Sequence, residues 1–247
     1  MSRVLFVLLL LSLVANLGAA WMVLKLYTDN NVLRLDPLQL AVYPDSPPLQ
    51  GREPRVVLFG DSRALSWPAP AVPGLDFVNR GIGQQTSAQI ALRFERHVTP
   101  LEPDLLVLQL CVNDLKVIPL VPEAQADIIQ GCKQQLQAII GKARLQGTEV
   151  LLTTVFPLGE VPLERRLFWS DAVAAAIREV NDFIRVQAGP GVHVLDTFAL
   201  LQGEPDHIRP EYSRDLLHLN AAGYTVLNQA LAAWLQDWQS KGPGRNQ

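Results

Sequence analysis

The sequence predicts an α/β protein with three layers, in which helices cover both faces of a five-stranded, mainly parallel sheet. From residue 55 onward, short apolar runs alternate with longer amphipathic segments. The short runs are continuously apolar rather than alternating in polarity, which is typical of parallel strands that are buried on both faces. At 247 residues, of which 49% are hydrophobic, the chain has room for one such domain and a short appendage.

The apolar runs and amphipathic segments define the expected elements. Strands are predicted at 56–60, 75–79, 104–111, 149–156 and 192–196. Helices are predicted at 85–98, 122–146, 168–188 and 221–238. In the last helix, leucines recur at four-residue steps from Leu227 to Leu235, and Asn220 is available as its N-cap. The order therefore consists of repeated βα units, as in a three-layer sandwich.

Residues 1–28 are predicted to be a membrane anchor or a signal sequence. The segment from Val4 to Leu24 is mainly apolar and long enough to span a bilayer. The small residues at 18–20 would suit a signal-cleavage site. However, the apolar run continues beyond them, and Trp21 and Tyr27 are typical of interfacial anchors. We favour an uncleaved transmembrane helix with an extracytoplasmic domain over a secreted or periplasmic protein released by cleavage; the flanking charges leave the orientation open.

A proline-rich linker is predicted at 29–54, because PDSPPLQGREP at 44–54 suits neither a helix nor a central strand. The globular domain is expected at 55–240. Residues 241–247 are expected to form a flexible tail.

Composition excludes several classes of function. A net charge of -3 and scattered Lys and Arg residues argue against nucleic acid as a partner. The cysteines and histidines lack metal-ligand spacing, so we expect no metal and no cofactor. Cys111 and Cys132 could form a disulfide in an oxidising compartment, but a cysteine at a strand end is first interpreted as a small buried residue, and we expect both to be reduced.

Two short motifs suggest a nucleophile and its base. Gly60-Asp61-Ser62 directly follows the first strand, at the sheet edge where open α/β folds bind ligands. Alone, this serine could equally cap a helix. Asp215 lies three residues before His218, close enough to orient its imidazole, although a surface Asp near a half-buried His is the commoner case. Together they provide the groups that activate a serine hydroxyl.

Two further segments could supply hydrogen bonds to an oxyanion. In NRGIG at 79–83, glycines permit close backbone approach, so the Gly81 N–H is a candidate donor. Asn113 follows a buried strand and has a neutral amide that can donate. A tight turn and an Asx turn are the structural alternatives for these two segments.

These motifs, GDS at 60–62, NRGIG at 79–83, VND at 112–114 and DLLHLNAAGY at 215–224, resemble the four signature blocks of the SGNH/GDSL hydrolases, in the same order. The resemblance covers about 55–240 and implies the flavodoxin-like fold of that family. It implies that Ser62 is the nucleophile, that His218 and Asp215 complete the triad, and that the oxyanion hole is formed by Ser62, Gly81 and Asn113. Two positions depart from the pattern, since Cys111 and Leu216 replace customary glycines.

The predicted function is a serine ester hydrolase acting through an acyl-enzyme on acylated carbohydrate or lipid, with short-chain esters such as O-acetyl groups preferred. Three alternatives stay open. The chain could be an O-acyltransferase to a glycan, which product analysis with a glycan acceptor would reveal. It could be a lysophospholipase or thioesterase, which an ester panel of varied acyl length would separate. It could also be a non-catalytic polysaccharide-binding module, which a fluorophosphonate probe would not label. The sequence leaves the oligomeric state open.

Overall fold

The computed structural model describes residues 2–44, 53–203 and 207–242, and its chain divides into two units, 1–41 and 42–247. The first unit consists mainly of helix α1 (Arg3–Leu35). Its N-cap is Ser2, whose side chain accepts a hydrogen bond from the Leu5 N–H. An 18-residue window of α1 has a mean hydropathy of 2.3, and none of its residues is buried, so α1 is long and apolar enough to cross a membrane. The helix continues beyond residue 28 because no proline interrupts the chain before Pro37.

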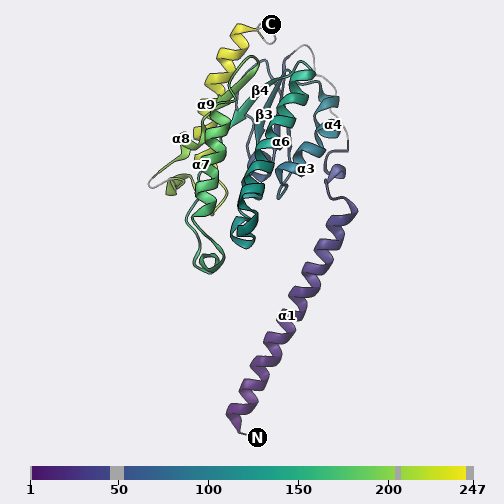
Figure 1. Cartoon of the computed structure of the whole chain (residues 1–247), viewed down its shortest axis with the longest axis vertical. Helices are drawn as coiled ribbons and strands as arrows, with labels where there is room; N and C mark the ends of the chain where they lie inside the picture. Colours follow the sequence, from purple (N-terminus) through teal and green to yellow (C-terminus); the bar gives the residue numbers. More distant parts are fainter. Residues whose placement is uncertain (1, 45–52, 204–206, 243–247) are drawn as a thin grey trace. The chain divides into compact units, whose positions relative to one another are not determined.

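The second unit contains a five-stranded sheet with the order β2-β1-β3-β4-β5. All four strand pairs are parallel, which confirms the predicted fold. The strands are β1 (Arg55–Gly60), β2 (Asp76–Gly81), β3 (Leu105–Gln109), β4 (Glu149–Thr153) and β5 (Val192–Leu195). Figure 1 shows this sheet lying between two layers of helices.

Alternate side chains of each strand point to opposite faces of the sheet, so two hydrophobic cores form. Val57 and Phe59 of β1 belong to one core, together with apolar residues of several helices, four of which follow. These are α3 (Ser87–Leu92), α4 (Phe94–His97), α6 (Gln125–Leu145) and α7 (Ala172–Arg185). Val56 and Leu58 belong to the other core, which is covered by α8 (Thr197–Leu201) and α9 (Ala221–Lys241).

The helix predicted at 85–98 is two helices, because Arg93 leaves the helical conformation and is both the C-cap of α3 and the N-cap of α4. This side chain is fully buried, and its guanidinium donates to Gln85 Oε1, the Arg80 carbonyl and the Gly60 carbonyl. Satisfying a buried guanidinium requires several acceptors at once, and here the acceptors lie on β1, β2 and the loop after β2. Arg93 therefore ties the first helical layer to the strand ends.

Residues expected to belong to the linker lie against the sheet domain. The Tyr43 hydroxyl donates to the Gly81 carbonyl at 2.7 Å, and the Arg80 guanidinium lies 4.6 Å from the centre of the Tyr43 ring. The segment 45–52, which contains most of the expected proline-rich linker motif, lies outside the described residues, as does the tail from 243 onward.

Candidate active site

The nucleophile candidate lies at the carboxyl end of β1, where the chain turns sharply into helix α2 (Ser62–Leu65). Gly60 is required at this turn, because a Cβ atom there would lie 1.8 Å from the Gln109 carbonyl oxygen. Asp61 then caps α2 by accepting a hydrogen bond from the Arg63 N–H. The turn leaves Ser62 half-exposed at the edge of the sheet.

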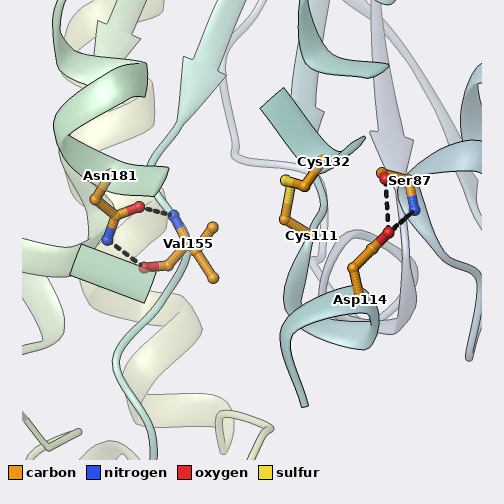
Figure 2. Close-up of a disulfide and its surroundings, with 6 residues drawn as sticks. All are labelled: Ser87, Cys111, Asp114, Cys132, Val155 and Asn181. Atoms are coloured by element: carbon orange, nitrogen blue, oxygen red, sulfur yellow. Dashed lines mark hydrogen bonds between the residues drawn. A yellow bond between two sulfur atoms is a disulfide. The ribbon is translucent and has the colours of Figure 1, made fainter. Parts of the chain in front are cut away.

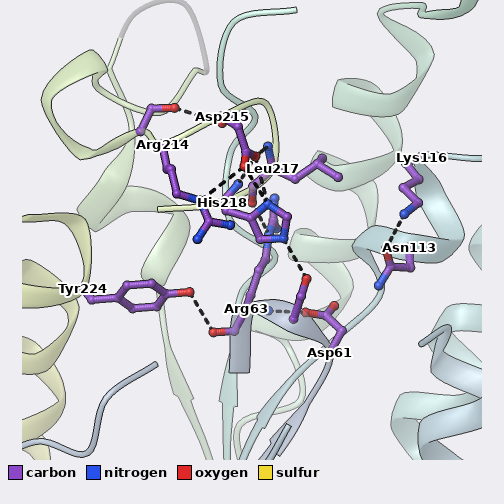
Figure 3. A network of polar contacts seen from close by, with 11 residues as sticks. Asp61, Arg63, Asn113, Lys116, Arg214, Asp215, Leu217, His218 and Tyr224 are labelled. Atoms are coloured by element: carbon purple, nitrogen blue, oxygen red, sulfur yellow. Dashed lines mark hydrogen bonds and ion pairs between the residues drawn. The ribbon is translucent and has the colours of Figure 1, made fainter. Parts of the chain in front are cut away.

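The structure brings Ser62, His218 and Asp215 together in one chain of hydrogen bonds. Figure 3 shows the contact between His218 and Asp215. Ser62 Oγ lies 2.9 Å from His218 Nε2. His218 Nδ1 lies 2.9 Å and 3.0 Å from the two carboxylate oxygens of Asp215. This order of contacts, hydroxyl to imidazole to carboxylate, is the one that activates a serine in acyl transfer.

Asp215 is held in its orienting position by the local backbone. Its Oδ1 accepts hydrogen bonds from the Leu217 and His218 N–H groups, both at 2.9 Å. Partial burial raises the pKa of this carboxyl, but the Leu217 N–H and the His218 side chain outweigh that effect and bring the pKa to about 2. Asp215 is therefore ionised at neutral pH, as the orienting member of a triad must be.

Leu216, which replaces a glycine of the family pattern, does not disturb this turn. Its carbonyl accepts a hydrogen bond from the Gly159 N–H at 2.8 Å, and its side chain is buried. The close backbone approach is provided by Gly159 instead, where a Cβ atom would lie 2.5 Å from the Asp215 carbonyl oxygen.

Arg63 lies at the candidate site although no sequence pattern predicts it there. It is completely buried, and its Nε donates to the Leu217 carbonyl at 2.8 Å. The Tyr224 hydroxyl donates to the Arg63 carbonyl at 2.9 Å. Burial lowers the pKa of its guanidinium to about 10, so it stays charged at neutral pH. Arg63 thus links the nucleophile turn to the loop that carries His218. No pattern in the sequence distinguishes it from a surface arginine.

Asn113 lies on helix α5 (Val112–Leu115), directly after β3, and its amide is fixed at both ends. Asn113 Nδ2 donates to the Gln85 carbonyl at 3.0 Å. Lys116 Nζ donates to Asn113 Oδ1 at 2.7 Å (Figure 3). The amide nitrogen has two hydrogens, so one remains for a substrate oxygen. The sequence did not point to Lys116, because no helix was expected at 112–115 and the three-residue spacing from Asn113 matters only on a helix.

The two cysteines form a disulfide, which corrects the expectation that both are reduced (Figure 2). It joins Cys111, at the N-cap of α5, to Cys132 on α6, with their Cα atoms 5.9 Å apart. Cys111 has φ of 88°, a left-handed conformation that favours glycine, which explains why the family pattern has glycine there. Figure 2 also shows Asp114 bonded to the Ser87 N–H and hydroxyl, which connects α5 to α3.

The expectation that the Gly81 N–H faces an oxyanion is corrected by the structure. This N–H donates to Asn79 Oδ1 at 2.8 Å. The glycine is needed for packing, because a Cβ atom there would lie 2.1 Å from the Leu65 nitrogen. Gly83 and Gln84 follow two and three residues later, and Gly83 faces Ser62, since a Cβ atom on Gly83 would lie 3.9 Å from the Ser62 Cβ. Neither of their N–H groups has an acceptor among the described residues.

A cavity of about 610 Å³ opens beside His218. One part of its wall is apolar, formed by Val117, Leu120, Pro162, Phe168, Trp169, Leu216 and Leu217. The polar part is formed by Gln84, Lys116, Glu164, Arg165, Asp215 and His218. Within 2–44, 53–203 and 207–242, no three His, Cys, Asp or Glu side chains come together as metal ligands would.

Fold and site together define a class, the parallel α/β proteins that carry a serine, a histidine and an aspartate in contact at the carboxyl ends of their strands. Residues 50–226 match the GDSL-like lipase/acylhydrolase family, and the chain belongs to this family of ester-bond hydrolases.

Known proteins resemble the chain at low identity. An uncharacterised lipoprotein of Bacillus subtilis, YqeF, is 28% identical over 142 residues, which are 50% of this chain and 57% of that protein. The chain thus spans little more than half the length of this relative. A GDSL-like lipase from Bacteroides thetaiotaomicron is 22% identical, with a TM-score of 0.62 over 81% of this chain and 98% of that one. An acetylxylan esterase from Geobacillus stearothermophilus is 17% identical, with a TM-score of 0.54 over 74% and 94%. These two structural likenesses show the fold.

Proposed function

We propose that the protein hydrolyses carboxylic esters through an acyl-enzyme on Ser62. The observation that carries this proposal is the unbroken contact from Ser62 Oγ to His218 Nε2 and from His218 Nδ1 to Asp215. Such a chain raises the reactivity of a hydroxyl that is otherwise a weak nucleophile. Membership in an ester hydrolase family supports the same chemistry.

In the proposed reaction, His218 accepts the Ser62 proton as Oγ attacks the ester carbonyl, then donates it to the leaving alcohol. Asp215 stabilises the imidazolium formed in between. The Ser62 N–H and the free Asn113 amide hydrogen stabilise the oxyanion. The third donor is the N–H of Gly83 or Gln84 rather than that of Gly81. Water activated by His218 then releases the acyl group.

The substrate we propose is a short-chain ester, with O-acetyl groups on a carbohydrate preferred. The acetylxylan esterase that shares the fold supports an acetyl ester as substrate. We further propose that α1 anchors the enzyme with its catalytic domain outside the cytoplasm. The apolar α1, the similarity to a lipoprotein and the disulfide, which persists in oxidising compartments, support this location.

Single substitutions test the triad. Ser62→Ala and His218→Ala in the full chain should each lower kcat for 4-nitrophenyl acetate by about 10⁴-fold or more with the fold unchanged, because each removes a group needed in the transition state. Ser66→Ala, on an exposed serine at the end of the same helix, serves as the matched control and should retain activity. A folded Ser62→Ala enzyme with wild-type turnover would remove the proposal.

A further inference from the structure

The cavity beside His218 contains two cationic side chains that have no acidic partner among the described residues. Lys116 Nζ donates to a neutral oxygen, Asn113 Oδ1, and makes no ion pair there. The Arg165 side chain, on the 3₁₀ turn η5 (Leu163–Phe168), makes neither a hydrogen bond nor an ion pair with any residue that the structure describes. Surface arginines commonly lack partners, but here two cations from separate elements line one cavity.

None of the nearby acidic groups that the structure describes forms an ion pair with these cations. Asp215 already contacts His218 and Arg214. Both oxygens of the Asp114 carboxylate accept hydrogen bonds from Ser87, and Asp61 is fully buried. Glu164 lines the same cavity but forms no ion pair with either cation.

Electrostatics agree with this arrangement. Burial lowers the pKa of Lys116, Asp61 opposes that change, and the positive charge of Arg165 lowers the pKa further. The two cations therefore lie close enough to repel each other. Like charges that line one cavity and have no ion-pair partner there favour binding of an anion between them.

We propose that this cavity binds an anionic group of the substrate, a carboxylate or phosphate near the scissile ester, through Lys116 and Arg165. The inference deepens the proposed function and rests on it. The apolar wall formed by Val117, Leu120, Phe168 and Trp169 then contacts the uncharged part of the same substrate. Guanidinium groups suit this role, because their planar donors match the oxygens of carboxylate and phosphate.

The test uses the full-length protein and compares esters of similar size that differ in charge, with release of the acyl group at the shared ester bond as the readout. In the first pair, 4-acetoxybenzoate and its methyl ester, the charge lies in the alcohol half. In the second pair, the charge lies in the acyl half. This pair consists of the 4-nitrophenyl half-ester of a dicarboxylic acid and the 4-nitrophenyl ester of the monocarboxylic acid of equal chain length. Wild-type protein should show a higher kcat/KM for the anionic member of at least one pair, and the pair identifies the half that is bound.

Arg165→Gln and the neighbouring Arg166→Gln form a matched comparison. Arg165 lines the cavity, whereas the Nε of Arg166 donates to the Val161 carbonyl at 3.5 Å. Arg165→Gln should lower the ratio of kcat/KM for the anionic to the neutral ester about tenfold, and Arg166→Gln should leave this ratio near the wild-type value. Equal effects of both variants on this ratio would overturn the inference, as would a wild-type protein that prefers neither anionic ester. Hydrolysis of the neutral esters would still support the proposed function in that case. Loss of all hydrolysis in the wild-type protein would overturn both.

Discussion

At the scale of single residues, the site depends on side chains that hold other side chains in place. The amide of Asn113 cannot rotate freely, because Lys116 donates to its oxygen and the Gln85 carbonyl accepts from its nitrogen. A fixed donor needs no reorganisation as charge develops in the transition state, which is the main advantage of an enzyme site over water.

This role of Asn113 is testable by kinetics. Asn113→Ala should lower kcat by about 10²–10³-fold with little change in KM, because the donor acts mainly in the transition state. Asn113→Asp should be at least as inactive, since it keeps the size and the contact with Lys116 but puts an acceptor where a donor is needed. A structural Asx turn would instead give a lower melting temperature with kcat near wild type. A fully active Asn113→Asp enzyme would show that the donor is elsewhere.

The buried Asp61 carboxyl should make the free energy of unfolding depend on pH. Complete burial raises the pKa of its carboxyl to about 6 in the fold, although the Arg63 charge opposes this, against an ordinary value of 3.8. Because the folded pKa is the higher one, the protonated carboxyl stabilises the fold below about pH 4, and this contribution is lost as pH rises through about 6.

Melting temperatures of wild-type protein and Asp61→Asn, measured from pH 4 to 8, test this prediction. Asparagine keeps the oxygen that accepts from the Arg63 N–H but does not titrate. The wild type should lose stability relative to the variant between about pH 4 and pH 6, and the difference should be constant above pH 7. A difference that is the same at every pH would contradict the raised pKa.

Much of the site could be predicted at this scale. Ser62 and Asn113 were identifiable as candidates because each follows a buried strand, and Asp215 because of its spacing from His218. Gly81 was wrongly expected as an oxyanion donor, because the direction of an N–H depends on the backbone, and here Asn79 accepts from it. Arg63 was missed because burial of an arginine follows from tertiary packing.

At the scale of elements, the turn between β3 and α5 is the critical one, since it carries Asn113. Cys111 adopts a left-handed conformation there and is bonded to Cys132 on α6. The sequence could not reveal this bond, because the two cysteines are 21 residues apart and approach only when α6 packs on the sheet. A disulfide here holds a conformation that costs a residue with a Cβ atom about 1 kcal/mol or more.

Two double variants separate the cross-link from the backbone conformation. Cys111→Ala with Cys132→Ala should reduce the free energy of unfolding by about 3 kcal/mol, from the lost cross-link over this loop. Cys111→Gly with Cys132→Ala should recover about 1 kcal/mol of that loss, because glycine adopts the left-handed conformation without strain. Urea denaturation of the full chain in detergent measures both. Equal stability of wild-type protein and the alanine pair would show that the cross-link does not stabilise the fold.

At the scale of the whole molecule, the predicted class and the parallel sheet are confirmed, because continuous apolar runs separated by amphipathic segments define strands covered on both faces. The strand order β2-β1-β3-β4-β5 could not be derived from those patterns, since it depends on which side of the sheet each connection crosses. This order puts β1 between β2 and β3, so the segments that carry Ser62, Gly83 and Asn113 meet at one edge.

Covalent labelling of the full-length protein tests the central claim, that Ser62 is a nucleophile activated by His218, most directly. The protein in detergent is treated with a fluorophosphonate probe, and the modified peptide is identified by mass spectrometry. We predict one adduct, on Ser62, which is absent in Ser62→Ala, forms much more slowly in His218→Ala, and forms at the wild-type rate in Ser66→Ala. An adduct on another residue, or labelling of Ser62→Ala at the wild-type rate, would contradict the account.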